Sequence, residues 1–247
     1  MLGVTWLQRG VRGILLYGLL LLLGLISLAW NLMAALLYPL LPAQRALVFG
    51  RAGIAHVYRA FWSLAQVIGV LKLDASELEG LRHEATGLII AANHPSMLDA
   101  LLIVSRLPNG VCVMKAELMR NIFLGAGARL ARYIRNDSPR AMIRGAVAHL
   151  RAGAHLVLFP EGTRTVQRPV NAFRPGITLI AQLAQVPIQT VLIETDSPYL
   201  SKGWPIWRVP AMPVVYRLRL GQRFAPEPDH AALLKRLETF FVEELRA

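Results

Sequence analysis

The sequence predicts an α/β fold with a central, largely parallel mixed sheet flanked by helices, preceded by an N-terminal hydrophobic membrane helix or helix pair. Three observations lead to this prediction. From about residue 71 onward, short apolar runs alternate with stretches of helical spacing, the pattern of strands joined by crossover helices. Residues 13–43 contain no charged side chain. The chain has 247 residues, of which 55% are hydrophobic and only Cys112 is cysteine, which excludes intrinsic disorder and an internal disulfide framework.

Residues 1–43 are predicted to anchor the chain to a membrane. Nine leucines and two isoleucines lie between Ile14 and Leu28, and each favours the bilayer by about 0.3–0.6 kcal/mol. A straight helix over residues 13–43 would measure roughly 45 Å, whereas the hydrocarbon core is about 30 Å thick. Two arrangements stay open: one tilted span followed by an interfacial stretch, or two shorter helices in one leaflet. A signal peptide is the alternative, although its apolar core normally has about 7–15 residues.

The rest of the chain divides into two parts. Residues 44–70 combine spaced arginines with aliphatic and aromatic residues at helical intervals, which predicts an amphipathic interfacial helix. Residues 71–247 are predicted to form one α/β domain. We expect its strands at residues 72–78, 87–92, 111–114, 132–134, 155–159, 188–194 and 214–220. We expect its helices near residues 96–106, 121–131, 138–152, 175–185 and 229–246.

The net charge of +12 indicates an anionic partner, either a membrane surface or a nucleic acid. Because the N-terminal segment is so apolar, we expect the membrane and no nucleic acid. Arginines flank the apolar run on both sides, so the charge pattern does not set its orientation.

Candidate functional residues follow two of the predicted strands, at the sheet edge where the carboxyl ends of parallel strands meet. The first strand runs into the sequence NHPSMLD at residues 93–99. With His94 before a helix and Asp99 one turn inside it, the carboxylate can hold one imidazole nitrogen and leave the other as a general base. The alternative is a structural histidine beside an aspartate at a helix start.

The second strand runs into PEGTR at residues 160–164. Gly162 permits close approach of the backbone, Thr163 offers a hydroxyl, and Arg164 offers a planar guanidinium suited to phosphate. A plain strand-to-loop turn with a solvated arginine is the alternative. Residues 115–174 carry eleven basic against three acidic side chains, which favours recognition of an anion.

The order and spacing of NHPSMLD, MKAEL, YIR, FPEGTR and VPIQTV resemble the glycerolipid acyltransferase family, most of all the lysophosphatidate (1-acyl-sn-glycerol-3-phosphate) acyltransferases. The resemblance covers roughly residues 70–195. Two departures touch the loops that shape the substrate pockets: the proline usual after the EL of the second block is absent at residues 119–122, and Thr190 replaces a proline in the fourth block. The identity of the acceptor and the length of the acyl chain therefore stay open.

The resemblance implies transfer of a fatty acyl group from acyl-CoA or acyl-carrier protein to the hydroxyl of a lysolipid, without a metal or another cofactor. His94 would be the general base and Asp99 would orient it, while Lys115 and the amide of Gly162 would stabilise the developing oxyanion. Arg164 would bind the acceptor phosphate. The other substrate-binding candidates are Asn93, Arg135, Glu161, which could bond a glycerol hydroxyl, Thr163 and Arg174.

Other functions remain possible from the sequence alone. These are acyl transfer to another lysophospholipid or a lyso-ornithine lipid, hydrolysis of a membrane lipid, and lipid binding without catalysis. No convincing nucleophile supports a hydrolase, since Ser96 suits a helix start and Cys112 falls inside an apolar strand. Residues 196–213 could form a lid, a second membrane contact or an irregular loop. The resemblance places the chain on the inner (cytoplasmic) membrane, with its catalytic domain facing the cytoplasm.

Overall fold

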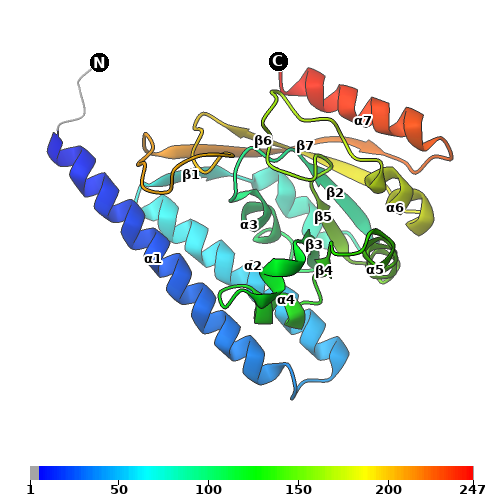
Figure 1. The fold of residues 1–247 in the computed structure, drawn as a ribbon, viewed down its shortest axis with the longest axis horizontal. Helices are drawn as coiled ribbons and strands as arrows, with labels where there is room; N and C mark the ends of the chain where they lie inside the picture. The colour runs from blue at the N-terminus through cyan, green and yellow to red at the C-terminus, as the bar shows by residue number, and fades with distance from the viewer. Residues whose placement is uncertain (1–5, 247) are drawn as a thin grey trace.

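The computed structural model describes residues 6–246 and contains a seven-stranded sheet in the order β1-β7-β6-β2-β5-β3-β4 (Figure 1). The strands are β1 (Leu71–Asp74), β2 (Leu88–Ala92), β3 (Gly110–Met114), β4 (Ile134–Arg135), β5 (His155–Leu158), β6 (Ile188–Thr195) and β7 (Val214–Phe224). Every neighbouring pair is parallel except β6 and β7, which are antiparallel. The predicted largely parallel mixed sheet is therefore confirmed.

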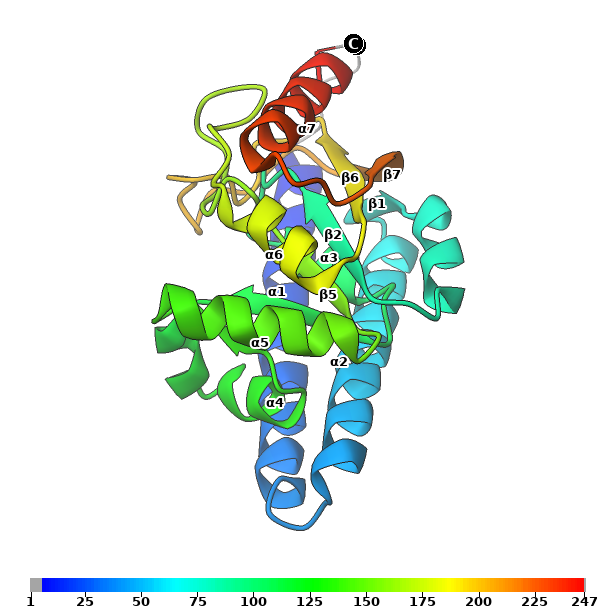
Figure 2. The same cartoon turned by 90° about the vertical axis from the view of Figure 1, so that its right-hand side faces the viewer.

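Helices cover both faces of the sheet. They are α1 (Trp6–Leu37), α2 (Ala43–Val67), α3 (Asp99–Val104), α4 (Gly125–Leu130), α5 (Pro139–Arg151), α6 (Gly176–Ala184) and α7 (His230–Glu244), with 3₁₀ helices η1 (Ser76–His83) and η2 (Ala116–Arg120). On one face, α5, α6 and α7 bury a core with Ile89 and Ala91 of β2 (Figure 2). On the other face, α1, α2 and α3 bury a core with Leu88, Ile90 and Ala92. The continuous apolar run of β2 thus reflects a strand that is buried on both sides.

Several predicted strands have different bounds in the structure, among them the strand predicted at residues 214–220, which extends to Phe224 as β7. Two of the differences have a local cause. The strand expected at residues 72–78 ends at Asp74, because the Asp74 carboxylate accepts hydrogen bonds from the backbone N–H and the hydroxyl of Ser76 and turns the chain into η1. The strand expected at residues 132–134 is only Ile134–Arg135, because Arg132 has φ of 55°, a left-handed conformation that a strand does not accommodate.

The predicted apolar segment forms one continuous helix up to Leu37, and α2 runs back beside it as the second arm of a helical hairpin (Figures 1 and 2). The turn between the two helices contains Pro39 and Pro42, which interrupt helical hydrogen bonding. The helices approach closely where Trp30 lies over Gly53, since a Cβ at that glycine would clash with the indole ring. Of the described helices, only α1, over Gly10–Leu37, is long and apolar enough to cross a membrane, and 28% of its apolar window is buried in the protein.

Helix α1 packs along the α/β domain. The side-chain amide of Asn31 accepts from the backbone N–H of Gly127 in α4 at 2.9 Å. Nearer the N-terminus, the Tyr17 hydroxyl donates to the carbonyl of Trp207 at 2.7 Å, and Arg12 donates to the carbonyl of Met212 at 3.2 Å. The apolar helix and the segment at residues 196–213 are therefore directly joined.

Candidate active site

The structure brings His94 and Asp99 together at the carboxyl edge of the sheet. His94 leaves β2, and its Nδ1 lies 2.8 Å from Oδ2 of Asp99. Helix α3 begins at Asp99 itself, later than predicted, so the intervening residues form a turn that brings the carboxylate back to the ring. The Asp99 side chain is fully buried, whereas 18% of the His94 side chain is exposed. The ring therefore presents one edge to solvent and holds the other against a buried acid.

The environment of Asp99 determines the proton positions in this pair. Its Oδ2 also accepts from the backbone N–H of Ser96 at 2.8 Å, while Oδ1 has no partner among the described residues. Burial raises the pKa of Asp99 to about 6, and the hydrogen bond from His94 acts in the opposite direction. A carboxylate accepts, so the contact assigns the His94 proton to Nδ1 and leaves Nε2 as a lone-pair base. The ring also stacks on Phe159, with centroids 4.0 Å apart.

Glu161 holds the backbone of His94 in place through a hydrogen bond. Its Oε1 accepts from the His94 N–H at 2.9 Å and from the Thr165 hydroxyl at 2.7 Å, while Oε2 accepts from the Asn171 N–H at 2.8 Å. The side chain is buried, and both oxygens are occupied within the protein. The prediction that Glu161 bonds a glycerol hydroxyl does not match this arrangement, because neither oxygen faces an open site.

Asn93 also has a structural role where substrate binding was predicted. Its buried amide donates to the carbonyl of Ile193 at 2.9 Å and accepts from the N–H of the same residue at 2.7 Å. This pair of bonds fixes the exit of β2 against β6. Substrate cannot reach the amide while both of its polar atoms are used in this way.

Replacement of Asn93 by alanine should lower the free energy of unfolding by roughly 2–4 kcal/mol, since a buried N–H and a buried carbonyl of Ile193 lose their partners. Denaturant unfolding followed by circular dichroism measures this change. Asn136→Ala, at an exposed asparagine, is the matched control and should change stability by less than about 0.5 kcal/mol. A loss of stability in Asn93→Ala no larger than that in Asn136→Ala would contradict the structural role of Asn93.

The amide of Gly162 is not a free donor to an oxyanion. Gly162 has φ of +69°, and its N–H donates to the carbonyl of Phe159 at 2.9 Å within a tight turn. The exposed Arg174 side chain lies over this turn, since a Cβ at Gly162 would be 2.5 Å from its Nε. The structure therefore brings Arg174 to the second strand end but assigns the glycine to the turn. Thr163, next in the turn, is exposed.

Arg164 connects this turn to the segment at residues 196–213. Its Nη1 donates to the carbonyls of Leu200 at 2.8 Å and Ser201 at 3.0 Å. Ser96 holds the same segment through a hydrogen bond to the carbonyl of Tyr199 at 3.1 Å. Among residues 6–246, the remaining guanidinium nitrogens of Arg164 have no partner. One side of this arginine is thus structural and the other is available to an anion.

Lys115 and Arg135 lie farther along the same sheet edge. Lys115 is exposed after β3, and Arg135 ends β4 and pairs with Asp137 at 2.9 Å. In the strand order, β3 is two positions and β4 three positions from β2, or about 10 and 14 Å at the usual strand spacing. Arg135 is therefore not part of the His94 site, contrary to prediction. Cys112 is buried, which raises its pKa to about 12 and disfavours a nucleophilic role.

The sequence reasoning did not predict the roles of Phe159, Ser96 and Thr165 in the site. Phe159 and Ser96 lie inside the two motifs, and their positions beside the strand ends were a usable signal. Thr165 donates its backbone N–H to the carbonyl of His94 at 2.8 Å, which no local pattern indicates.

Comparison with known proteins shows that this chain is similar to acyltransferases. The Acyltransferase family model matches residues 73–194, which include both strand-end motifs. A 1-acyl-sn-glycerol-3-phosphate acyltransferase of Limnanthes alba is 29% identical over 148 residues, which are 57% of this chain and 52% of that protein. The enzyme of the same name from Pseudomonas aeruginosa is 23% identical over 202 residues, 79% of this chain and 76% of that protein. The chain spans about half to two thirds of the length of the first curated relatives it matches.

The fold is also shared with a solved structure. The crystal structure of the 1-acyl-sn-glycerophosphate (LPA) acyltransferase PlsC from Thermotoga maritima aligns with a TM-score of 0.68 at 22% sequence identity, covering 97% of this chain and 99% of that one. The matched segment begins in β1 and ends in β6, and so contains the strands that position His94, Asp99 and Glu161. Residues 73–194 of this chain are therefore a domain of the Acyltransferase family.

Proposed function

We propose that this chain is a membrane-bound O-acyltransferase that transfers a fatty acyl group from a thioester, acyl-CoA or acyl-carrier protein, to the free hydroxyl of lysophosphatidate and so forms phosphatidate. The observation that carries the proposal is the His94–Asp99 pair at the carboxyl edge of the sheet, within a matched acyltransferase domain. The acceptor follows from the relatives, which are named 1-acyl-sn-glycerol-3-phosphate acyltransferases.

In the proposed reaction, Nε2 of His94 removes the hydroxyl proton as the acceptor oxygen attacks the thioester carbonyl. Asp99 stabilises the imidazolium that forms, because its carboxylate already accepts from Nδ1. When the tetrahedral intermediate collapses, the C–S bond breaks and His94 returns the proton to the leaving thiolate. The steps need no metal or prosthetic group. Lys115 is the candidate donor to the oxyanion, since the Gly162 amide is occupied by Phe159.

Arg164 and Arg174 are the proposed ligands of the acceptor phosphate. Both guanidiniums belong to the loop that follows β5, and Glu161 in that loop bonds the backbone of His94. Arg174 is exposed over the Gly162 turn. Of the guanidinium nitrogens of Arg164, only Nη1 donates to the backbone, so the others are available to a phosphate. A phosphate held there would place the rest of a lysolipid beside the histidine.

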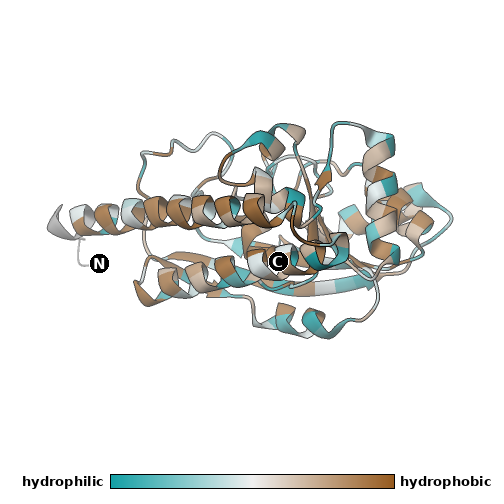
Figure 3. Ribbon diagram, turned by 90° about the horizontal axis from the view of Figure 1, so that it is seen from below, coloured by the Kyte–Doolittle hydropathy of each residue, from teal (hydrophilic) through white to brown (hydrophobic). Residues whose placement is uncertain are grey.

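The surface around the site supports attachment to a membrane. The ribbon of helix α1 is coloured mostly hydrophobic in Figure 3. Its exposed large apolar side chains include Leu21, Leu25, Leu32 and Leu36. Ile122 and Trp207 are exposed apolar side chains on two loops that contact α1. In one loop the carbonyl of Phe123 accepts a hydrogen bond from Asn31, and in the other the carbonyl of Trp207 accepts one from Tyr17. Exposed apolar side chains on α1 and on the loops that contact it suit the bilayer interface. We propose that this surface lies on the cytoplasmic side of the inner membrane, where a lysolipid can enter the site laterally.

Acyl transfer by the purified protein in detergent tests this function. Labelled acyl-CoA would be offered with lysophosphatidate, lysophosphatidylcholine, lysophosphatidylethanolamine and a lyso-ornithine lipid, and the expected result is at least about tenfold preference for lysophosphatidate. If wild-type protein does not react with acyl-CoA, acyl-carrier protein replaces it as donor. Preference for another acceptor would overturn the substrate assignment. Release of free fatty acid without dependence on any acceptor would instead indicate a hydrolase.

A further inference from the structure

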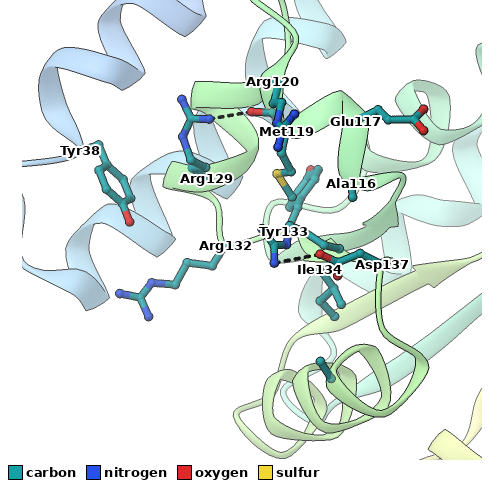
Figure 4. A pocket seen from close by; sticks show the side chains of 12 residues that line it. Tyr38, Ala116, Glu117, Met119, Arg120, Arg129, Arg132, Tyr133, Ile134 and Asp137 are labelled. Atoms are coloured by element: carbon teal, nitrogen blue, oxygen red, sulfur yellow. Dashed lines mark hydrogen bonds and ion pairs between the residues drawn. The ribbon is translucent and has the colours of Figure 1, made fainter.

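A pocket lies outside the His94 site, at the carboxyl ends of β3 and β4 (Figure 4). Its volume is about 750 Å³, within the range of small-molecule sites. The walls come from η2, α4, β4 and the turn of the α1–α2 hairpin. Neither the proposed base nor the proposed phosphate ligands of the acceptor line this pocket, so the mechanism above leaves it without a role.

The pocket is strongly basic. Four arginines line it, at positions 120, 129, 132 and 135, against the carboxylates of Glu117 and Asp137. Asp137 pairs with Arg135, and Arg129 is held by a hydrogen bond to the carbonyl of Met119 at 2.6 Å. In Figure 4, Glu117 points away from Arg129 and Arg132. Within the described part of the chain, Arg120, Arg129 and Arg132 form no ion pair, so three guanidinium charges are available to an anionic ligand.

Arg132 occupies a position where the backbone favours glycine. It follows the end of α4 with φ of 55°, and its neighbour Tyr133 donates its N–H back to the carbonyl of Ala128 at 2.9 Å, as in a helix C-terminal motif. A side chain in this left-handed conformation costs energy that glycine would avoid. Glycine would therefore fit the backbone at residue 132 without strain, so the arginine side chain can be removed there without loss of stability.

The pocket and the catalytic site share one edge of the sheet. The strand order separates β4 from β2 by three positions, or about 14 Å, with the exposed Lys115 between them. In acyl-CoA, the thioester is joined to the 3′-phosphoadenosine diphosphate group by the long, flexible pantetheine arm. One donor molecule can thus place its thioester beside His94 and its phosphates in the pocket.

We propose that this arginine pocket binds the 3′-phosphoadenosine diphosphate end of acyl-CoA, an inference that rests on the proposed acyl transfer. The diphosphate and the 3′-phosphate supply several anionic groups to match three guanidiniums, whereas the headgroup of phosphatidylglycerol supplies one phosphate. The half-exposed ring of Tyr38, which lines the pocket, offers a surface on which adenine can stack (Figure 4). The phosphates lie far from the reacting carbonyl, so the pocket contributes to donor affinity and not to chemistry.

Calorimetric titration of the purified protein with coenzyme A tests this assignment without requiring turnover. The double variant Arg120→Gln/Arg132→Gly should bind coenzyme A at least about tenfold more weakly. Because glycine relieves the left-handed backbone, Arg132→Gly alone should melt no lower than wild type, which separates lost binding from lost folding. Arg217→Gln removes an exposed arginine on β7, toward the opposite edge of the sheet, and should leave affinity unchanged.

Kinetics with two donors complete the test. The double variant should raise the KM for acyl-CoA at least about tenfold with little change in kcat, while kcat/KM with an acyl N-acetylcysteamine thioester, which lacks phosphates, should not change. Equal losses with both donors, or no binding of coenzyme A by wild type, would overturn the proposal. So would a variant that retains coenzyme A but loses binding to phosphatidylglycerol vesicles, since the ligand would then be a lipid headgroup. Coenzyme A binding at this pocket without any acyl transfer would leave the pocket assignment intact and refute only the proposed function.

Discussion

Asp99→Asn should reduce kcat for acyl transfer by about 10–10²-fold, because a neutral amide replaces the charged partner of the imidazolium. The Ser96 N–H and Nδ1 of His94 both contact Oδ2 of Asp99, so the asparagine oxygen in that position can still accept from both. The proton therefore stays on Nδ1, and the loss of rate reports the negative charge with which Asp99 stabilises the imidazolium formed in the reaction. Single-turnover kinetics with labelled acyl-CoA measure the loss. The exposed Asp196 provides a control, since Asp196→Asn should keep kcat within about threefold of wild type.

The same substitution should stabilise the protein at neutral pH. The pKa of Asp99 is raised from 3.8 to about 6 because burial disfavours its charged form. A raised pKa in the folded state means that stability is greatest below about pH 4 and is lost as the pH rises through about 6. Asparagine does not ionise, so the variant should exceed wild type by roughly 1–3 kcal/mol at pH 8 and by less at pH 5. Unfolding at both pH values measures this, and a variant less stable than wild type at pH 8 would contradict it.

His94→Ala should reduce acyl transfer by about 10²–10⁴-fold, because no other described side chain can take the acceptor proton at this position. The substitution removes the imidazole, but the backbone N–H of residue 94 can still donate to Glu161. The measurement is kcat with lysophosphatidate and acyl-CoA, compared with His56→Ala, which removes an exposed histidine of α2. Retention of more than about a tenth of the wild-type rate would refute general base catalysis by His94.

Features of the site that depend only on residues close together in the sequence could be predicted. The buried strand β2, the turn after it and the five-residue spacing of His94 and Asp99 are all local, so their pairing could be predicted. The roles of Glu161 and Asn93 could not, because their partners lie 67 and 100 residues away. A carboxylate or an amide next to a site can bond substrate or backbone equally well, and tertiary contacts decide which it does.

The position of Arg135 could not be predicted because it depends on the order of strands in the sheet. Its motif lies between the two strand-end motifs in sequence, yet β3 and β5 separate β4 from β2 in the sheet. The turn at Gly162 shows a related limit. Glycine predicts the positive φ, but whether the resulting N–H points to a ligand or to the carbonyl of Phe159 depends on the surrounding loop.

The segment at residues 196–213 is fixed at both ends, and this has a mechanical consequence. Arg164 and Ser96 hold its beginning at the His94 loop, while Tyr17 and Arg12 hold its end at α1. A change in the tilt or depth of α1 must therefore stretch these contacts or carry the His94 loop with it. In the proposed membrane-bound state, lateral pressure in the lipid around α1 would act as a force on the His94 loop, and the turnover number should then depend on the elastic state of the bilayer.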